Sequence, residues 1–181
     1  EDCLLVIGYV ADALAYAWES AGVIHCDIKP DNILIDADGS PKVTDLGLAR
    51  TISAMTDDSI SGEVMGTPVY MSPEQAQGLP DLDCRTDIYS LGAMLYHCIT
   101  GRMLFEGDPE ELVLERQLRD QVPSAQEINQ DISTATCGLI EKMLAKDRAV
   151  RYQDWRTVQH DIVRAKKGLP PFEPLKETGL S

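Results

Sequence analysis

Apolar residues recur along much of the chain at the intervals of amphipathic helices. Near the start the spacing is four residues, and the series consists of Val6, Val10, Leu14 and Trp18. This spacing places the apolar side chains on one face of a helix, and a glycine just past the last turn is a common helix end. We therefore expect the first helix to end near Gly22.

Four more helices are expected further along the chain. The most apolar one begins near Asp87 and stops at Gly101, and its uninterrupted apolar face suits the centre of a fold. The sequence Asp-Pro-Glu-Glu at 108–111 predicts another helix start, with Asp108 as N-cap and a capping-box glutamate. Two shorter helices are expected over about 133–145 and 154–167.

The stretch between the first two helices has the pattern of a small hairpin. Residues 33–35 and 42–44 are predicted strands around the turn at 36–39, so Asn32 and Asp45 should lie at neighbouring strand ends. The polar residues from Leu48 to Met65 show no period, and we expect a mobile segment there.

Candidate chemistry is concentrated in residues 25–32, His-Cys-Asp-Ile-Lys-Pro-Asp-Asn. Asp27 could accept a proton from a hydroxyl, and Lys29 could offset charge on a phosphoryl group in transfer. Asn32 and Asp45 are hard oxygen ligands suited to Mg²⁺, which keeps its other positions for water and phosphate. The sequence therefore predicts a phosphoryl-transfer site.

Five motifs in this order resemble the C-terminal lobe of a eukaryotic-type serine/threonine protein kinase, most closely its bacterial branch. They are a catalytic loop at 25–32, a magnesium loop at 45–47, an acceptor-docking loop at 66–71, an activation-segment end at 72–74 and a buried-helix start at 87–92. The resemblance implies a mainly α lobe with a small β-hairpin at the catalytic cleft. It covers residues 1–168 and leaves 169–181 as a tail or linker.

The resemblance also implies residue roles. The catalytic group would be Asp27, Lys29, Asn32 and Thr67; the nucleotide would meet Lys29, Asn32 and Asp45; Mg²⁺ would be held by Asn32 and Asp45; and His25, Glu74, Asp87 and Arg151 would be structural. For Asp87, both a helix cap and a brace for the catalytic loop are structural readings. His25 is interpreted as a packed core histidine, and Arg151 as the partner of Glu74.

The implied cofactors are ATP and Mg²⁺, and the implied acceptor is a protein serine or threonine. A glycine-rich loop, a strand lysine and its partner glutamate are not found in the sequence. We therefore expect an N-terminal lobe upstream as a partner in cis, and we expect the chain by itself to bind MgATP poorly.

Two departures keep other readings open. Cys26 replaces the arginine that pairs with a phosphate on the activation segment in most relatives, and Leu46 replaces a phenylalanine. We hypothesise that phosphorylation of Thr51, Thr56 or Ser59 does not switch the protein on through that pocket. A pseudokinase or degenerate half-domain scaffold is the first alternative, and a small-molecule phosphotransferase, which would lack the docking loop, is the second.

Composition and charge limit the classes of partner and the location that we expect. The formal net charge of −14 over 181 residues argues against nucleic acid and anionic membrane surfaces. Seven basic residues against three Asp over 146–167 are interpreted as a solvated helix face. No run approaches the roughly 18 apolar residues of a membrane span, and five cysteines without a C-x-x-C spacing favour a reducing cytoplasm.

Overall fold

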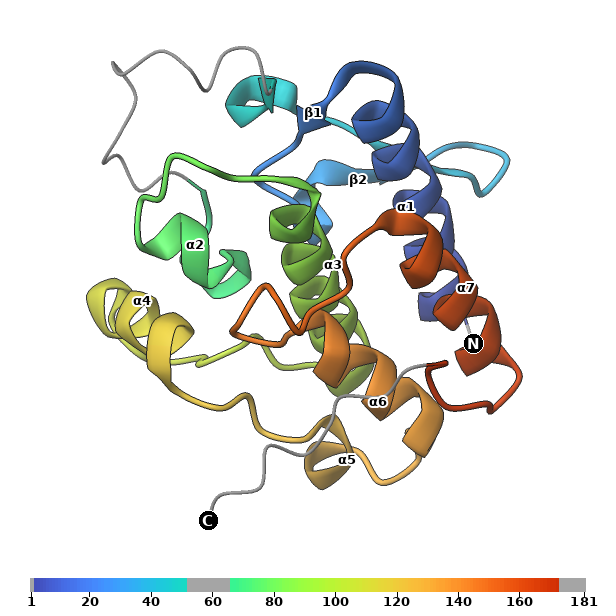
Figure 1. Ribbon diagram of the computed structural model, residues 1–181. Coiled ribbons are helices and arrows are strands. Elements are labelled where there is room, and N and C mark those ends of the chain that lie inside the picture. The colour runs from blue at the N-terminus through green and yellow to red at the C-terminus, as the bar shows by residue number, and fades with distance from the viewer. Residues whose placement is uncertain (1, 52–65, 173–181) are drawn as a thin grey trace.

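The computed structural model describes residues 2–51 and 66–172 of the 181. Helices surround one central helix, α3, and the strands form two small antiparallel pairs (Figure 1). This confirms the mainly α fold with a small hairpin. The elements are α1 (Asp2–Ala21), β1 (Val23–Ile24), η1 (Pro30–Asn32), β2 (Ile33–Ile35), β3 (Pro41–Val43), η2 (Leu46–Leu48), β4 (Arg50–Thr51), η5 (Pro68–Tyr70), α2 (Pro73–Ala76), α3 (Cys84–Thr100), α4 (Glu110–Arg119), α5 (Ala125–Ile128), α6 (Thr134–Met143) and α7 (Trp155–Lys166).

The core is built around α3. Its side chains from Cys84 to Tyr96 are buried with the single exception of Arg85. A β-carbon at Gly92 would lie only 2.6 Å from the β-carbon of Met143, so α3 and α6 approach each other too closely for any larger residue. The expected apolar helix is therefore confirmed, and its neighbours pack on it directly.

The start of α3 corrects one expectation. The helix begins at Cys84 and not near Asp87, because Asp83 is its N-cap and accepts a hydrogen bond from the Arg85 N–H (2.9 Å). Asp87 therefore lies one turn inside the helix. Its carboxylate is free of the cap role and reaches another part of the chain. The C-terminal end is as expected, since Gly101 adopts a left-handed conformation with φ 71°.

The helix after residue 108 begins differently from the prediction. Pro109 occupies the N-cap position and no side chain caps the helix. The carboxylate of Asp108 instead pairs with Arg116, two turns along α4. The expected capping box is therefore wrong, because the ion pair with a nearby cation takes the side chain that the cap would use.

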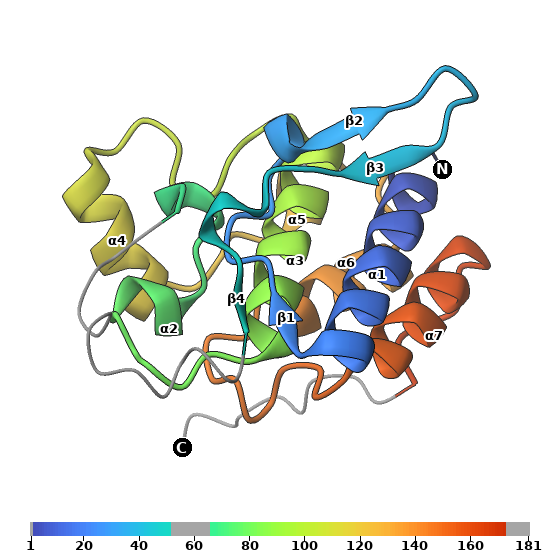
Figure 2. The ribbon, with the colours of Figure 1, turned by 90° about the horizontal axis from the view of Figure 1, so that it is seen from above.

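The hairpin forms as expected, except that its second strand, Pro41–Val43, begins and ends one residue earlier than predicted. β2 pairs with β3 so that Ile33 faces Val43, and Gly39 (φ 85°) makes the turn. Figure 2 shows this pair beside the N-terminal part of α1. A second pair, β1 with β4, was not expected, because β4 lies in the polar stretch predicted to be mobile. Residues 52–65 of that stretch lie outside the described residues.

α1 and α7 lie side by side in both views (Figures 1 and 2). By length and composition alone, α1 could cross a membrane, so the expectation that no segment approaches a span was too strict for this helix. One face of α1, with Ile7, Val10, Ala11 and Leu14, is buried in the same core as α3 and α7. This packing accounts for the apolar residues on that face, whereas Leu5, Tyr9 and Tyr16 on the rest of α1 are exposed.

The last described residues continue past α7 without helix. Gly168 has φ 69°, Pro171 is buried against Gly138 of α6, and the Phe172 N–H donates to Asp161 (3.0 Å). Residues 169–172 therefore pack against the lobe. The remainder of the predicted tail, 173–181, lies outside the described residues.

Candidate active site

The loop at 25–32 is attached to the central helix by one buried carboxylate. Asp87 accepts hydrogen bonds from the backbone N–H groups of His25 (2.7 Å) and Cys26 (2.9 Å). Burial raises the pKa of Asp87 to about 6, although both N–H groups and His25 act in the opposite direction. Asp87 thus braces the loop, which is one of the two roles considered for it.

His25 is buried and links the loop to the hairpin. Its Nδ1 accepts from the Asp27 N–H (3.3 Å), so the other nitrogen, Nε2, carries the proton that it donates to the Thr44 carbonyl (3.0 Å). Both ring nitrogens are occupied within the protein. The imidazole is therefore placed as a packed core residue and not as a base.

Asp27 lies at the centre of a cluster of hydrogen bonds. Oδ1 accepts from the Thr67 N–H (3.2 Å) and hydroxyl (3.1 Å), while Oδ2 meets Lys29 Nζ (2.8 Å) and Asn32 Nδ2 (3.1 Å). Burial by itself would raise the pKa of Asp27, but these donors outweigh it and the pKa lies below its usual value. Asp27 is therefore ionised at neutral pH and able to accept a hydrogen bond from a hydroxyl.

Thr67 joins the docking loop to this cluster. Its hydroxyl donates to Asp27 and accepts from Lys29 Nζ (2.8 Å), so all three side chains meet at one oxygen. The preceding residue, Gly66, has φ 125°, and a β-carbon there would be 3.2 Å from the Cys26 carbonyl. Glycine is favoured at position 66 because of its positive φ and because the backbones of the two loops lie too close together for a larger residue.

The side-chain oxygen atoms of Asn32 and Asp45 are ligands of the kind that Mg²⁺ prefers. Asn32 Nδ2 donates to both the backbone carbonyl (2.8 Å) and the carboxylate of Asp27. Because both neighbours are acceptors, the amide nitrogen must face them, which leaves Oδ1 available to a cation. The hairpin brings the neighbouring strand end to Asn32, whose carbonyl accepts from the Thr44 N–H (2.9 Å).

Asp45 is held in a left-handed conformation with φ 62°, and its Oδ1 accepts from the Gly47 N–H (3.1 Å). A β-carbon at Gly47 would come within 2.9 Å of that oxygen, so the turn favours glycine. Among the described residues no group of three or more His, Cys, Asp or Glu side chains gathers. One amide and one carboxylate suit an ion whose remaining positions are filled by phosphate and water.

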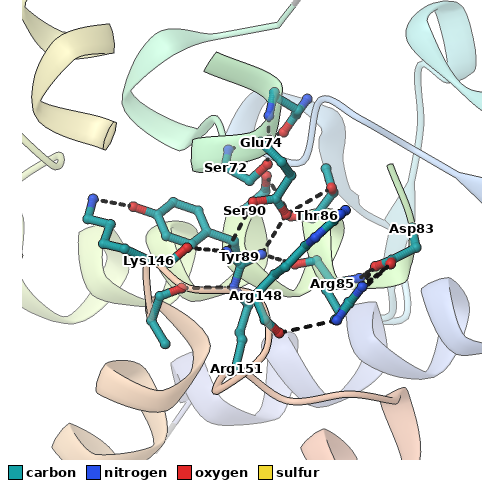
Figure 3. A network of polar contacts seen from close by, with 12 residues as sticks. Ser72, Glu74, Asp83, Arg85, Thr86, Tyr89, Ser90, Lys146, Arg148 and Arg151 are labelled. Carbon is teal, nitrogen blue, oxygen red and sulfur yellow. Dashed lines mark hydrogen bonds and ion pairs between the residues drawn. The ribbon is translucent and has the colours of Figure 1, made fainter. Parts of the chain in front are cut away.

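The predicted pair of Glu74 and Arg151 is present and almost completely buried (Figure 3). Two parallel contacts join the guanidinium to the carboxylate, at 2.7 and 3.1 Å. Arg151 also donates to the backbone carbonyls of Arg85, Ala145 and Lys146. The pair therefore ties α2, which follows the docking loop, to α3 and to the loop before α7.

Cys26 occupies the position expected to hold an arginine. Its side chain is buried in a small apolar cluster with Ile24 and Leu82, and its backbone has φ 66°. Burial, aided by Asp87, raises the pKa of the thiol to about 12, so it carries no charge at neutral pH. Of the three candidate phosphorylation sites, Thr51 lies in β4, and Thr56 and Ser59 lie outside the described residues.

Two buried glutamines were missed from the sequence. Gln75 Nε2 donates to the Cys26 carbonyl (2.7 Å) and Gln117 Nε2 donates to the Pro68 carbonyl (3.1 Å). Both tie loops of the site to helices. For Gln117 a signal existed, since it follows the buried Val113 by four residues on the inner face of α4.

The fold and this set of side chains are those of the helical lobe of a kinase-like phosphotransferase. The chain belongs to the protein kinase family, because the family model described as the protein kinase domain matches residues 1–163. That match covers the catalytic loop, the docking loop, the central helix and Arg151.

Similar proteins include the serine/threonine-protein kinase PknB of Mycobacterium leprae, 36% identical over 96% of this chain and 28% of that protein. PknB of Mycobacterium tuberculosis is 38% identical over 93% of this chain and 27% of that protein. A probable serine/threonine-protein kinase of Clostridium perfringens is 40% identical over 87% of this chain and 23% of that protein. The chain thus spans about a quarter of the length of the curated relatives it matches.

Proposed function

We propose that the protein is a serine/threonine protein kinase, and that this chain supplies its phosphoryl-transfer residues and its protein-acceptor loop. The observation that carries the proposal is the cluster in which Asp27, Lys29 and Asn32 meet Thr67 of the docking loop. A hydroxyl brought by a protein to that loop would lie beside an ionised carboxylate.

In this proposal Asp27 orients the acceptor hydroxyl and takes its proton as the phosphoryl group is transferred. The ammonium of Lys29, held between Asp27 and Thr67, offsets negative charge that develops on the transferred group. Asn32 and Asp45 would hold Mg²⁺, which supplies positive charge next to the phosphates of ATP.

We further propose that an N-terminal lobe acts in cis on the exposed apolar side of the site. Leu34 and Ile35 of β2 and Leu46 beside Asp45 are 57%, 58% and 63% exposed. Exposed apolar side chains next to polar site residues mark a surface that another domain or protein covers. The reducing cytoplasm is the proposed location, since all five cysteines are free thiols.

Phosphate transfer from ATP to a protein such as myelin basic protein tests the function in the full-length gene product. Asp27→Asn should lower the rate about 10²- to 10⁴-fold, because the amide can neither take the proton nor pair with Lys29. Asp38→Asn, the same change in the exposed hairpin turn, is the matched control. If Asp27→Asn phosphorylates as well as wild type, the assigned roles are wrong. If wild type transfers no phosphate but binds partners, the scaffold alternative is favoured.

A further inference from the structure

Gln117 is a completely buried polar side chain that touches the acceptor-docking loop. It projects from α4 with 0% exposure, and its Nε2 donates to the carbonyl of Pro68 (3.1 Å), 49 residues earlier in the chain. Pro68 directly follows Thr67, whose hydroxyl contacts Asp27 and Lys29. The carbonyl that Gln117 holds is therefore one residue from the catalytic cluster.

The other end of the same amide is fixed as well. Gln117 Oε1 accepts from the Tyr89 hydroxyl (2.6 Å) and from Lys146 Nζ (3.4 Å), and Lys146 Nζ also donates to the Tyr89 oxygen (2.8 Å). Figure 3 shows Lys146 and Tyr89 in contact beside α3. Two donors on one side and a carbonyl on the other allow only one orientation of the amide. We call this chain of contacts, Lys146–Tyr89–Gln117–Pro68, the Gln117 relay.

Lys146 is held in an unusual way for a lysine. No ion pair joins it to a carboxylate among the described residues; its ammonium lies 5.4 Å from the ring centre of Tyr89 and 5.1 Å from that of Phe105. Aromatic rings stabilise a cation through their electron-rich faces. The oxygen atoms of Tyr89 and Gln117 stabilise it through their lone pairs. The ammonium group of Lys146 therefore donates its hydrogen bonds to Tyr89 and Gln117 and not to a carboxylate.

We propose that Gln117 is a positioning residue that fixes the docking loop, so that Thr67 stays in contact with Asp27 and Lys29 when a protein acceptor binds. This inference rests on the proposed kinase function. The loop carries the acceptor, so a small displacement of Pro68 would move the bound hydroxyl away from Asp27. A change far from the reacting atoms that misplaces them by about 1 Å can lower a rate by about 10²-fold.

Gln117→Glu is the sharpest variant. It keeps an oxygen for Tyr89 and Lys146 but replaces the donor to Pro68 with a second acceptor. In the full-length protein we expect the kcat with an acceptor peptide to fall and the KM for that peptide to rise about tenfold, with the KM for ATP changed by less than about twofold. Gln117→Met, which removes both contacts, should act in the same direction.

Gln126→Glu is the matched control, because Gln126 of α5 donates to the Ile132 carbonyl at the same 3.1 Å but lies away from the docking loop. It should leave the acceptor KM unchanged. An acceptor KM that rises no more for Gln117→Glu than for Gln126→Glu, or a KM for ATP that rises equally, would overturn the inference.

Hydrogen exchange separates this inference from the function itself. The Met71 N–H donates to the same Pro68 carbonyl (3.2 Å), and the Tyr70 N–H donates to the Thr67 carbonyl (2.9 Å). Gln117→Glu should accelerate exchange at both amides even if the wild-type protein transfers no phosphate. Unchanged exchange at these amides would show that Gln117 does not position the loop.

Discussion

Two ion pairs of similar length have opposite surroundings in this lobe. Lys29 and Asp27 are 2.8 Å apart, with side chains 22% and 10% exposed, whereas Arg151 and Glu74 are 2.7 Å apart and 0% and 4% exposed. In the second pair, Thr86 also donates to Glu74 (3.1 Å), and backbone carbonyls accept from the guanidinium. The first pair meets groups from two loops, while the second is enclosed by helices.

The difference shows how burial separates a structural pair from a chemical one. Charges removed from water need every donor and acceptor satisfied, and Arg151 with Glu74 meets this requirement within the protein. Nothing is left for a ligand. The pair of Asp27 with Lys29 remains partly in contact with solvent, so a substrate can exchange with its neighbours at low cost.

The largest expected effect compares the two cations directly. Arg151→Met should lower the free energy of unfolding by about 3–5 kcal/mol, because it leaves the Glu74 carboxylate buried without a partner. Lys29→Met should cost less than about 1 kcal/mol, since Asp27 can be solvated. Urea unfolding followed by circular dichroism measures both.

A double variant sharpens the same comparison. Glu74→Leu combined with Arg151→Met should recover part of the lost stability, because no unpaired charge then remains in the core. Equal losses for Arg151→Met and Lys29→Met would contradict the distinction between the pairs.

Lys146 presents a third arrangement, a partly buried cation with no carboxylate at ion-pair distance among residues 2–51 and 66–172. Burial first, then the nearby Arg151 and Arg116, lower its pKa to about 8, and Asp120 opposes this. Above pH 8 the folded protein loses the proton while the unfolded chain, with a pKa near 10.5, keeps it. Stability contributed by this group therefore rises as the pH increases from about 8 to 10.5.

Lys146→Met should lack this increase. We expect the unfolding free energy of wild type to gain on the order of 1 kcal/mol relative to the variant between pH 7.5 and roughly pH 10, after screening by solvent. Parallel pH profiles of the two proteins would mean that Lys146 keeps an ordinary pKa. Titrating groups that do not contact Lys146 are common to both proteins and cancel in the difference.

The smallest expected effect concerns the activation segment. Replacing Thr51, Thr56 and Ser59 together with alanine should change the phosphorylation rate by less than about twofold. The neutral thiol of Cys26 cannot form with a phosphate the charge-assisted contact that an arginine would make. Abolished activity in the triple variant, with mass spectrometry showing phosphate on these residues in wild type, would reject the hypothesis.

Much of the fold could be predicted because its main elements have local signals. The spacing in α1 and α7 and the apolar run of α3 specify long helices, and the turn at Gly39 specifies the hairpin. The pairing of β1 with β4 has no such signal, because each strand has two residues and the partners lie 26 to 28 residues apart. Four-residue helices such as α2 and α5 are too short to show a period.

The site residues also divide into those with a sequence signal and those without one. The motif placed Asp27, Lys29, Asn32 and Thr67 in one site, and the structure brings them together. Gln117 was missed because glutamine side chains are mostly exposed in proteins, and its neighbours in α4 are largely charged. Asp108 was misread as a helix cap because its carboxylate pairs with Arg116. Of the two roles considered for Asp87, the structure shows the brace for the loop at His25 and not the cap. Tertiary contacts override local propensity in such cases.

The attachments of the site to α3 have a consequence for thermal motion. Asp87 holds the catalytic loop, Thr86 contacts Glu74 after the docking loop, and a hydrogen bond joins His97 Nδ1 to the Tyr70 hydroxyl within that loop (2.7 Å). All three connections share one helix, so a translation of that helix carries the catalytic and docking loops along by the same vector. Such vibrations cancel in the distance between Asp27 and Thr67, and only motion of one loop against the other can disturb the reacting geometry.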